Sequence, residues 1–201
     1  MFALVESGSI IKFLNGNKGI QIGDLKYPRA IYTLWTEAER NAINIYAVEY
    51  DDSNKKDEQW YINTNQSYAF ANDKVTATYG SATAKAHADT TWTEEDEDND
   101  LGTEGEVATR GLKYNLIRDV KAQAADELAR TDWYITRKVE KSTAIPSAIT
   151  THRNLVRSRQ AAMETSITNA SDTPALETLY TYTTDSDGVQ SRPLAEIPTL
   201  D

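Results

Sequence analysis

The residues of this chain that could do chemistry are few. Its only imidazoles are His87 and His152, and cysteine is absent. An imidazole site for a metal or for proton transfer needs partner groups at set spacings, and neither histidine has such neighbours. No His-Glu-x-x-His, Gly-x-Ser-x-Gly or phosphate-loop pattern occurs. Any enzyme would have to be built on carboxylates, so we expect a non-enzymatic protein with no catalytic residue, no cofactor and no metal.

One acidic run has part of the spacing of a calcium loop. Asp96, Asp98 and Asp100 match the first, third and fifth ligand positions of a helix-loop-helix calcium site. The sixth position requires glycine and is Leu101, and the twelfth requires a bidentate glutamate and is Val107. A solvated acidic segment is therefore the preferred interpretation of this run.

The net charge of -10 over 201 residues is unevenly distributed. Residues 1–93 carry -2, residues 94–106 carry -8, residues 107–170 carry +5 and residues 171–201 carry -5, which sum to -10. An acidic protein is repelled by phosphate backbones, so we expect no nucleic-acid partner. The sequence also has no apolar run of about 20 residues and no secretory signal, so we expect no membrane partner and synthesis in a cytoplasm.

The first part of the chain, residues 1–93, is predicted to be a small antiparallel β-rich module. Ser7-Gly8 separates short apolar runs as a hairpin turn does, and Thr36 with Glu39 has the spacing of a capping box before a short helix over 37–44. Its aromatic side chains could line a carbohydrate-binding surface, but core packing is favoured because each ring buries a large area. These aromatic residues include Trp35, Tyr46, Tyr50, Trp60, Tyr61, Tyr68 and Tyr79.

The middle of the chain is predicted to separate two domains. Residues 94–106 hold eight acids and no base, and a segment of like charges repels itself and buries no apolar surface. We therefore expect an acidic linker over 94–109.

The part that follows the predicted linker has helical periodicity. Apolar residues recur every three or four positions, and Pro146 interrupts the pattern once. Two amphipathic helices joined by a short loop predict an antiparallel hairpin over 110–170, followed by a short helix and an extended arm over 171–201. The predicted fold class is therefore α+β. The predicted stripe comprises Leu112, Leu116, Ile117, Val120, Ala124, Leu128, Trp133, Ile135 and Val139 in the first helix, and Ile149, Leu155, Val156, Met163 and Ile167 in the second.

A motif within the predicted hairpin resembles a known group of proteins. The segment Glu127–Glu140 contains Leu-x-x-Thr-Asp-Trp, and it is followed by Ile-Pro at Pro146 and by Arg-x-x-x-Arg from Arg153. This order resembles the helical region of bacteriophage tail-fibre-associated proteins, including the tail assembly chaperone family. The resemblance covers residues 110–180, and His152 stands where those proteins usually have tyrosine.

The resemblance implies a role in phage tails. We expect a structural component of the virion tail, associated with the tail fibre or the baseplate, that binds other tail or fibre proteins and forms homo-oligomers in the assembly. The alternative is a tail-fibre assembly chaperone that is absent from the mature virion, and a third hypothesis is a carbohydrate-binding or carbohydrate-active module.

The motif also has a physical interpretation. Thr131 and Asp132 are expected to bond locally at a bend, and Trp133 is expected to anchor the hairpin by burial. Arg137 and Arg153 are expected to pair with Glu140 or Asp132 across the hairpin, which adds about 0 to 1 kcal/mol for each exposed pair. The candidate residues for the hairpin and its contacts are Leu128, Thr131, Asp132, Trp133, Arg137, Glu140, Pro146, Arg153 and Arg157.

Overall fold

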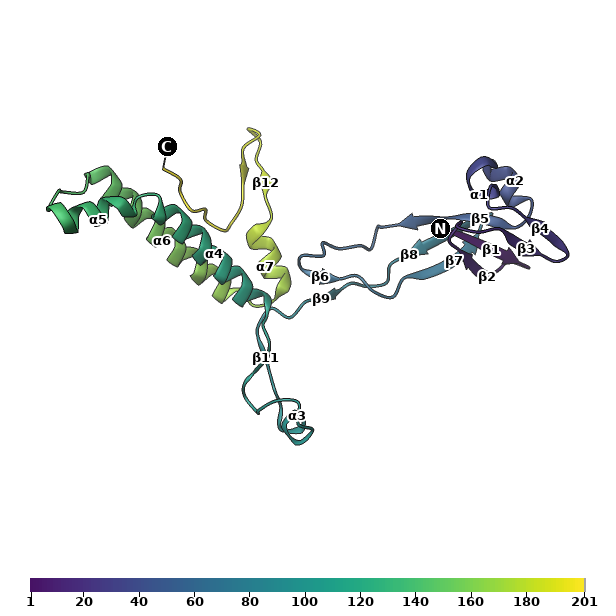
Figure 1. Ribbon diagram of the computed structural model, residues 1–201, viewed down its shortest axis with the longest axis horizontal. Helices are drawn as coiled ribbons and strands as arrows, with labels where there is room; N and C mark the ends of the chain where they lie inside the picture. The colour runs from purple at the N-terminus through teal and green to yellow at the C-terminus, as the bar shows by residue number, and fades with distance from the viewer. Residues whose placement is uncertain (201) are drawn as a thin grey trace. The chain divides into compact units, whose positions relative to one another are not determined.

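The computed structural model describes residues 1–200 and confirms a mixed α+β protein (Figure 1). The chain forms two compact units, Met1–Thr83 and Ala84–Asp201. The first unit holds a five-stranded sheet and two short helices, and the second holds four longer helical segments. None of the helices within residues 1–200 is both long and apolar enough to cross a membrane.

The sheet of the first unit has the strand order β2-β1-β5-β8-β7. β1 and β2 form an antiparallel hairpin around Ser7 and Gly8, which have φ of 50° and 78°. This left-handed conformation favours glycine. The hairpin turn predicted at Ser7-Gly8 is confirmed. The sheet strands are β1 (Phe2–Glu6), β2 (Ser9–Leu14), β5 (Ile45–Asp51), β7 (Ser67–Ala71) and β8 (Lys74–Thr78). Two-stranded pairs join β3 (Ile20–Ile22) with β4 (Leu25–Tyr27), and β6 (Tyr61–Ile62) with β9 (Thr83–Ala84).

The prediction of a wholly antiparallel module is wrong at one pairing. β5 and β8 run parallel, with Val48 opposite Val75. After β5 the chain leaves the sheet and returns as the β7–β8 hairpin, whose second strand pairs with β5. Val48, Val75 and Ala77 are all buried there, so burial on one face sets the register of this pair.

Alternation along the strands gives the sheet two apolar faces. Ala3 and Val5 belong to one buried cluster, whereas Leu4, between them, belongs to the other. The second cluster is covered by α1 (Ile31–Leu34), which contributes the buried Ile31 and Tyr32. The sequence did not predict this helix, because four residues are too few to show helical periodicity.

The capping box predicted at Thr36 is confirmed. The Glu39 amide donates to Thr36 Oγ1 over 3.3 Å, and the Thr36 amide donates to Glu39 Oε2 over 2.7 Å. The helix that it starts, α2 (Glu37–Asn41), ends earlier than residue 44, because Asn44 adopts a left-handed φ of 61°. The aromatic side chains of this unit were predicted either to pack in the core or to line an exposed surface. Tyr46, Trp60 and Tyr61 are buried, whereas Tyr50 is exposed.

The predicted linker over 94–109 is ordered, and the first unit ends before it, at Thr83 rather than residue 93. β10 (Thr90–Thr91) pairs with β11 (Val107–Thr109), and α3 (Glu94–Asp98) lies between them. Thr93 and Asp96 form a capping box, so Asp96 bonds to backbone instead of serving as a loop ligand. Trp92 packs against Gly102, where an added Cβ would lie 2.3 Å from the indole nitrogen. These local contacts outweigh the repulsion, and we call residues 92–106 the acidic lobe.

The helices of the second unit are α4 (Leu112–Ala129), α5 (Asp132–Lys141), α6 (Ser147–Asn169) and α7 (Thr173–Tyr180). The prediction of a single long first helix is wrong, because α4 ends at Ala129 and α5 begins at Asp132, with two residues between them. α4 and α6 pack antiparallel, since Lys113 bonds to the Thr168 carbonyl near one end of the pair and Glu127 bonds to His152 near the other. Their buried apolar residues are Leu116, Val120, Ala124, Ile149, Val156, Met163 and Ile167.

The end of the chain is more folded than the predicted extended arm. α7 begins as predicted, with the Asp172 carboxylate accepting from the Ala175 amide over 2.8 Å. After α7, β12 (Thr183–Thr184) and β13 (Gln190–Ser191) form a small hairpin. Leu194 is then fully buried, and its amide donates to the Leu179 carbonyl over 3.0 Å.

Replacing Gly111 with alanine tests the close contact between the start of α4 and the backbone of Ala88. Gly111 precedes α4 with a φ of -81°, which alanine adopts easily, but an added Cβ would lie 2.3 Å from the carbonyl carbon of Ala88. Overpacking against backbone should lower the free energy of unfolding by about 1–3 kcal/mol. Denaturant melts of Gly111→Ala and of the exposed control Thr109→Ala measure this, and the control should change by less than about 0.5 kcal/mol. Equal midpoints for both variants and the wild type would contradict this contact between Gly111 and Ala88.

Candidate functional site

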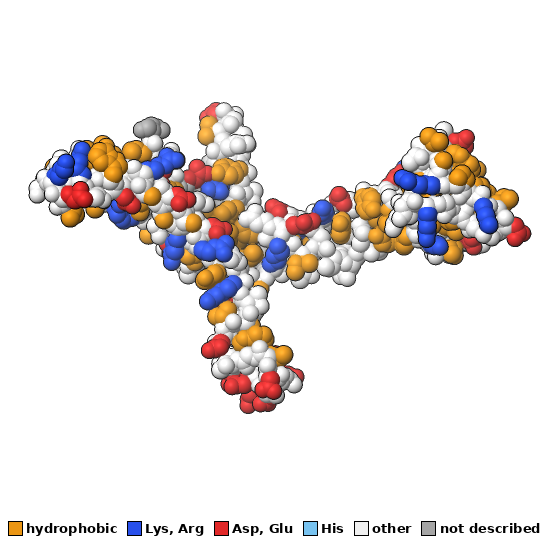
Figure 2. Space-filling model, viewed as in Figure 1, with side chains coloured by type: hydrophobic (Ala, Val, Ile, Leu, Met, Phe, Trp, Pro, Cys, Tyr) orange, Lys and Arg blue, Asp and Glu red, His pale blue; other side chains and the backbone are white. Residues whose placement is uncertain are grey.

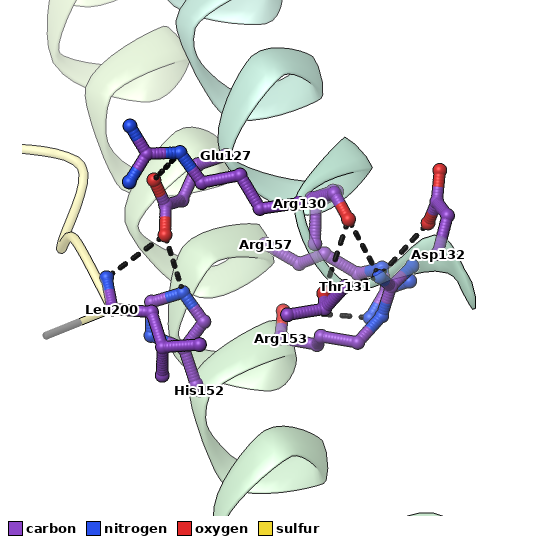
Figure 3. A network of polar contacts seen from close by, with 9 residues as sticks. Glu127, Arg130, Thr131, Asp132, His152, Arg153, Arg157 and Leu200 are labelled. Atoms are coloured by element: carbon purple, nitrogen blue, oxygen red, sulfur yellow. Dashed lines mark hydrogen bonds and ion pairs between the residues drawn. The ribbon is translucent and has the colours of Figure 1, made fainter. Parts of the chain in front are cut away.

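The best-defined polar cluster within residues 1–200 lies where α4 ends and α5 begins (Figure 3). Thr131 separates the two helices with φ -116° and ψ 7°, which is outside the helical region. The last carbonyls of a helix have no partner inside the helix and require one from elsewhere. At this junction the partner comes from α6, about one helix diameter away.

Arg153 of α6 provides that partner. Its Nη1 donates to the Leu128 carbonyl and to Thr131 Oγ1, both over 2.7 Å, and Thr131 in turn donates to the Leu128 carbonyl over 3.0 Å. Arg153 and Thr131 are 7% and 1% exposed, so these bonds are shielded from water. A cation is also favoured near the C-terminal end of a helix, where the carbonyl dipoles accumulate. Arg153 therefore ends α4 and holds the junction against α6.

The ion pair between Arg153 and Asp132 is a smaller contribution. The two groups approach to 2.9 Å, but the Asp132 side chain is 60% exposed. Solvent screens such a pair, so we assign most of the stabilisation to the buried bonds to Leu128 and Thr131. The sequence predicted this pair but placed it on the surface, because it gives no measure of the burial of Arg153.

A second pair of polar side chains, Glu127 and His152, lies about one helical turn from Thr131. This pair was not predicted from the sequence. Glu127 Oε1 lies 2.9 Å from His152 Nε2 and also accepts from the Leu200 amide over 2.9 Å. Both side chains are buried, at 5% and 9% exposure, and Arg130 approaches the other carboxylate oxygen to 3.5 Å. Four segments of the second unit meet here: α4, the junction, α6 and the chain end (Figure 3). Glu127 and His152 lie 25 positions apart in the chain, so no local pattern of the sequence indicates their pairing.

Two opposing effects, burial and bonding to neighbouring groups, set the pKa of Glu127. Burial of the carboxylate raises its pKa, but the Leu200 amide, the His152 ring and the Arg130 guanidinium together lower it further. The net result is a pKa below the ordinary value for glutamate. The carboxylate is therefore stabilised in its ionised form by its partners in the fold.

What this arrangement can do chemically is limited by the contacts that it already makes. A glutamate and a histidine can transfer protons, but Glu127 has three partners, and the hydroxyl of Thr131 is engaged by Arg153 and Leu128. Within residues 1–200, no three side chains of the histidine, aspartate and glutamate types are grouped so that they could hold a metal ion. These contacts join α4, α5 and α6 to one another. We call the group of Leu128, Thr131, Asp132 and Arg153 the latch.

The structure divides the predicted site residues into two groups. Leu128, Thr131, Asp132 and Arg153 meet at the latch, and Arg157 lies beside them, with its Nη1 3.4 Å from the Arg153 carbonyl. Pro146, with a φ of -53°, precedes the first turn of α6 and starts that helix. The other group lies along α5 and comprises Trp133, Arg137 and Glu140.

The prediction that Trp133 anchors the hairpin by burial is wrong. Its side chain is 51% exposed and stacks on Tyr134, with ring centroids 3.9 Å apart. Arg137 lies over both rings, 4.7 Å and 5.2 Å from their centroids, and no Arg137–Glu140 ion pair occurs in the part of the chain that the structure describes. The reason is the break at Thr131, which turns α5 out of the packed α4–α6 pair.

α5 consequently projects with none of its ten residues buried. Residues four apart share one side of a helix. One side of α5 carries Ile135 and Val139, which are 38% and 79% exposed, and we call this pair the apolar ridge. The rest of the α5 surface carries mainly aromatic and basic residues, with Glu140 at its edge. We call these residues the cationic aromatic face: Trp133, Tyr134, Arg137, Lys138 and Lys141.

Comparison with known proteins adds no relative. No protein family, no curated protein and no solved structure matches the chain.

Arg153→Ala is expected to destabilise the second unit. The change leaves the Leu128 carbonyl and the Thr131 hydroxyl without their charged donor in a buried site, which costs about 2–3 kcal/mol. Chemical denaturation followed by helical circular dichroism measures the loss. Arg159→Ala is the matched control, since Arg159 lies on the same helix but is exposed, and it should change stability by less than about 0.5 kcal/mol. Indistinguishable midpoints for the two variants would rule out the latch.

Acid is expected to weaken the second unit through Glu127. Because the folded pKa lies below its ordinary value, the contribution of this carboxylate is present at neutral pH. It is lost as the pH falls below about 4.5, the ordinary range of glutamate, and through the lower folded pKa. Denaturant midpoints measured from about pH 7 to about pH 3 should fall more steeply for the wild type than for Glu127→Gln. Parallel pH profiles would contradict this role.

Proposed function

We propose that this chain is a non-enzymatic structural component of a bacteriophage tail, associated with the tail fibre or baseplate, that attaches one tail protein to another. The first unit would dock to the virion, and the helical unit would contact a fibre or another tail protein. The proposal is supported by the exposure of α5. Its assignment to phage tails rests on the interpretation of the Leu-x-x-Thr-Asp-Trp motif as one that resembles tail-fibre-associated proteins.

The observation that carries the proposal is the exposure of α5. A ten-residue helix is marginal in water by itself, and most helical stability in proteins comes from packing an apolar side. Within residues 1–200, Val139 is 79% exposed and Ile135 is 38% exposed, so the apolar ridge is not fully packed, whereas the bond between Arg153 and Thr131 holds the start of the helix in place. A helix fixed at one end and exposed along its apolar ridge fits a protein-binding element.

The amount of this protein in virions tests the role. A structural component should be present in purified virions in fixed ratio to the other tail proteins, as quantified by mass spectrometry. Absence from virions, together with failed fibre attachment when the gene is deleted, would favour the alternative, a tail-fibre assembly chaperone. Absence with normal attachment would contradict both roles.

Val139→Ser is expected to reduce incorporation into virions without unfolding the protein. Val139 is 79% exposed, so the change should alter the free energy of unfolding by less than about 0.5 kcal/mol. Loss of its methyl groups weakens apolar contact with a partner. The measurement is the amount of the variant in virions at equal expression. Leu155→Ser, on the exposed side of α6, is the control and should be incorporated normally; equal incorporation of both variants would exclude the apolar ridge as the contact.

A further inference from the structure

The two ends of α4 carry opposite charge. The acidic lobe leads into the start of α4, and residues 94–106 hold eight acids and no base. Beyond the end of α4, residues 130–141 hold four bases and two acids, which gives 4 - 2 = +2. Figure 2 shows the acidic side chains gathered around the segment that Figure 1 labels α3. The second unit is therefore electrically polar along α4.

The acidic lobe is held at the start of α4. Asp89 accepts from Arg110 over 2.6 Å and from the Gly111 amide over 2.8 Å. The Leu112 amide donates to the Ala86 carbonyl over 3.0 Å. These bonds fix both strands at the base of the lobe to the first turn of α4.

The acidic lobe and α5 lie at opposite ends of α4, so they cannot contact each other within one molecule. The 18 residues of α4 span about 27 Å, which is several Debye lengths at physiological salt. No hydrogen bond or ion pair joins the acidic lobe to α5 in the part of the chain that the structure describes. The attraction between them therefore acts between molecules, and a second copy of the chain supplies both surfaces.

The two surfaces also match in kind. The cationic aromatic face of α5 combines exposed basic groups with the half-exposed ring of Trp133. The acidic lobe exposes Glu94, Glu95 and Asp98 on α3, and the adjacent Leu101 is 60% exposed. An apolar side chain within an acidic surface complements an aromatic ring within a basic one.

We propose that the cationic aromatic face of α5 binds the acidic lobe of a second copy of this chain. The proposal names one partner for the attachment element of the proposed function and rests on that function only in treating α5 as a binding element. It leaves the apolar ridge free for a different protein. Because the two surfaces differ, the contact is head-to-tail, and repetition closes a ring or extends a filament.

Sedimentation equilibrium of the full chain tests the contact. The wild type should self-associate at about 0.05 M salt and dissociate toward monomer at about 1 M salt, where the Debye length is about 3 Å. Two charge-reversed variants are compared with it. In one, five exposed acids of the acidic lobe become lysine, which changes residues 94–106 from -8 to +2: Glu94→Lys, Glu95→Lys, Asp98→Lys, Glu104→Lys and Glu106→Lys. The other has Lys138→Glu with Lys141→Glu in α5. Each should raise the dissociation constant at least about tenfold, since like charges then face each other. The control reverses two exposed lysines of the first unit, Lys12→Glu with Lys26→Glu, and should associate like the wild type.

Mixing the two variants gives the decisive result. Each variant fails to pair with itself, but the reversed lobe of one matches the reversed α5 of the other, so an equimolar mixture should regain association. Misfolded variants would not regain it. A wild type that stays monomeric at low salt, variants that associate normally, or a mixture that stays dissociated would each overturn the proposal. None of these results depends on the presence of the protein in virions, which tests the proposed function separately.

Discussion

The second unit depends on the buried contact between Arg153 and the end of α4. A helix cannot end inside a packed protein with its last carbonyls unpaired, because each unpaired buried group costs about 1–3 kcal/mol. Arg153 reaches from α6 to the Leu128 carbonyl and the Thr131 hydroxyl, so the helix can end there. The same contact fixes the direction in which the chain leaves α4. α5 projects outward because its first residues are held in place and the rest make few contacts.

The pair of Glu127 and His152 adds a second constraint of the same type. A buried carboxylate is tolerated only when its oxygens are bonded, and here the ring of His152, the Leu200 amide and Arg130 supply the bonds. The chain end is thereby bonded to α4, at a residue that precedes Leu200 by 73 positions. A polar pair at this site specifies one arrangement of α4, α6 and the chain end, which apolar contacts alone would select less strictly.

The acidic lobe shows how local order can overcome electrostatic repulsion. Its capping box at Thr93 and Asp96 supplies acceptors for the first amides of α3, and acids at a helix start are favoured by the helix dipole. Trp92 packs on Gly102 and gives the lobe a small apolar contact. The charge of the segment is therefore presented on an ordered surface. A rigid α4 then separates that surface from the basic end, which suits contact between molecules rather than within one.

The sequence by itself determined the features that depend on neighbouring residues. The α+β class, the capping box at Thr36, the Ser7-Gly8 turn and the start of α6 at Pro146 all follow from short-range geometry and hydrogen bonding. Tertiary structure decided the rest: the parallel pairing of β5 with β8, the break at Thr131, the burial of Arg153 and the exposure of Trp133. The apolar spacing widens to five residues between Leu128 and Trp133, but such a gap does not by itself end a helix. The bond of Arg153 to the Leu128 carbonyl shows that the helix ends there. Whether a ring is buried depends on the direction of its helix, and a residue twenty-two positions away, Arg153, sets that direction through Thr131.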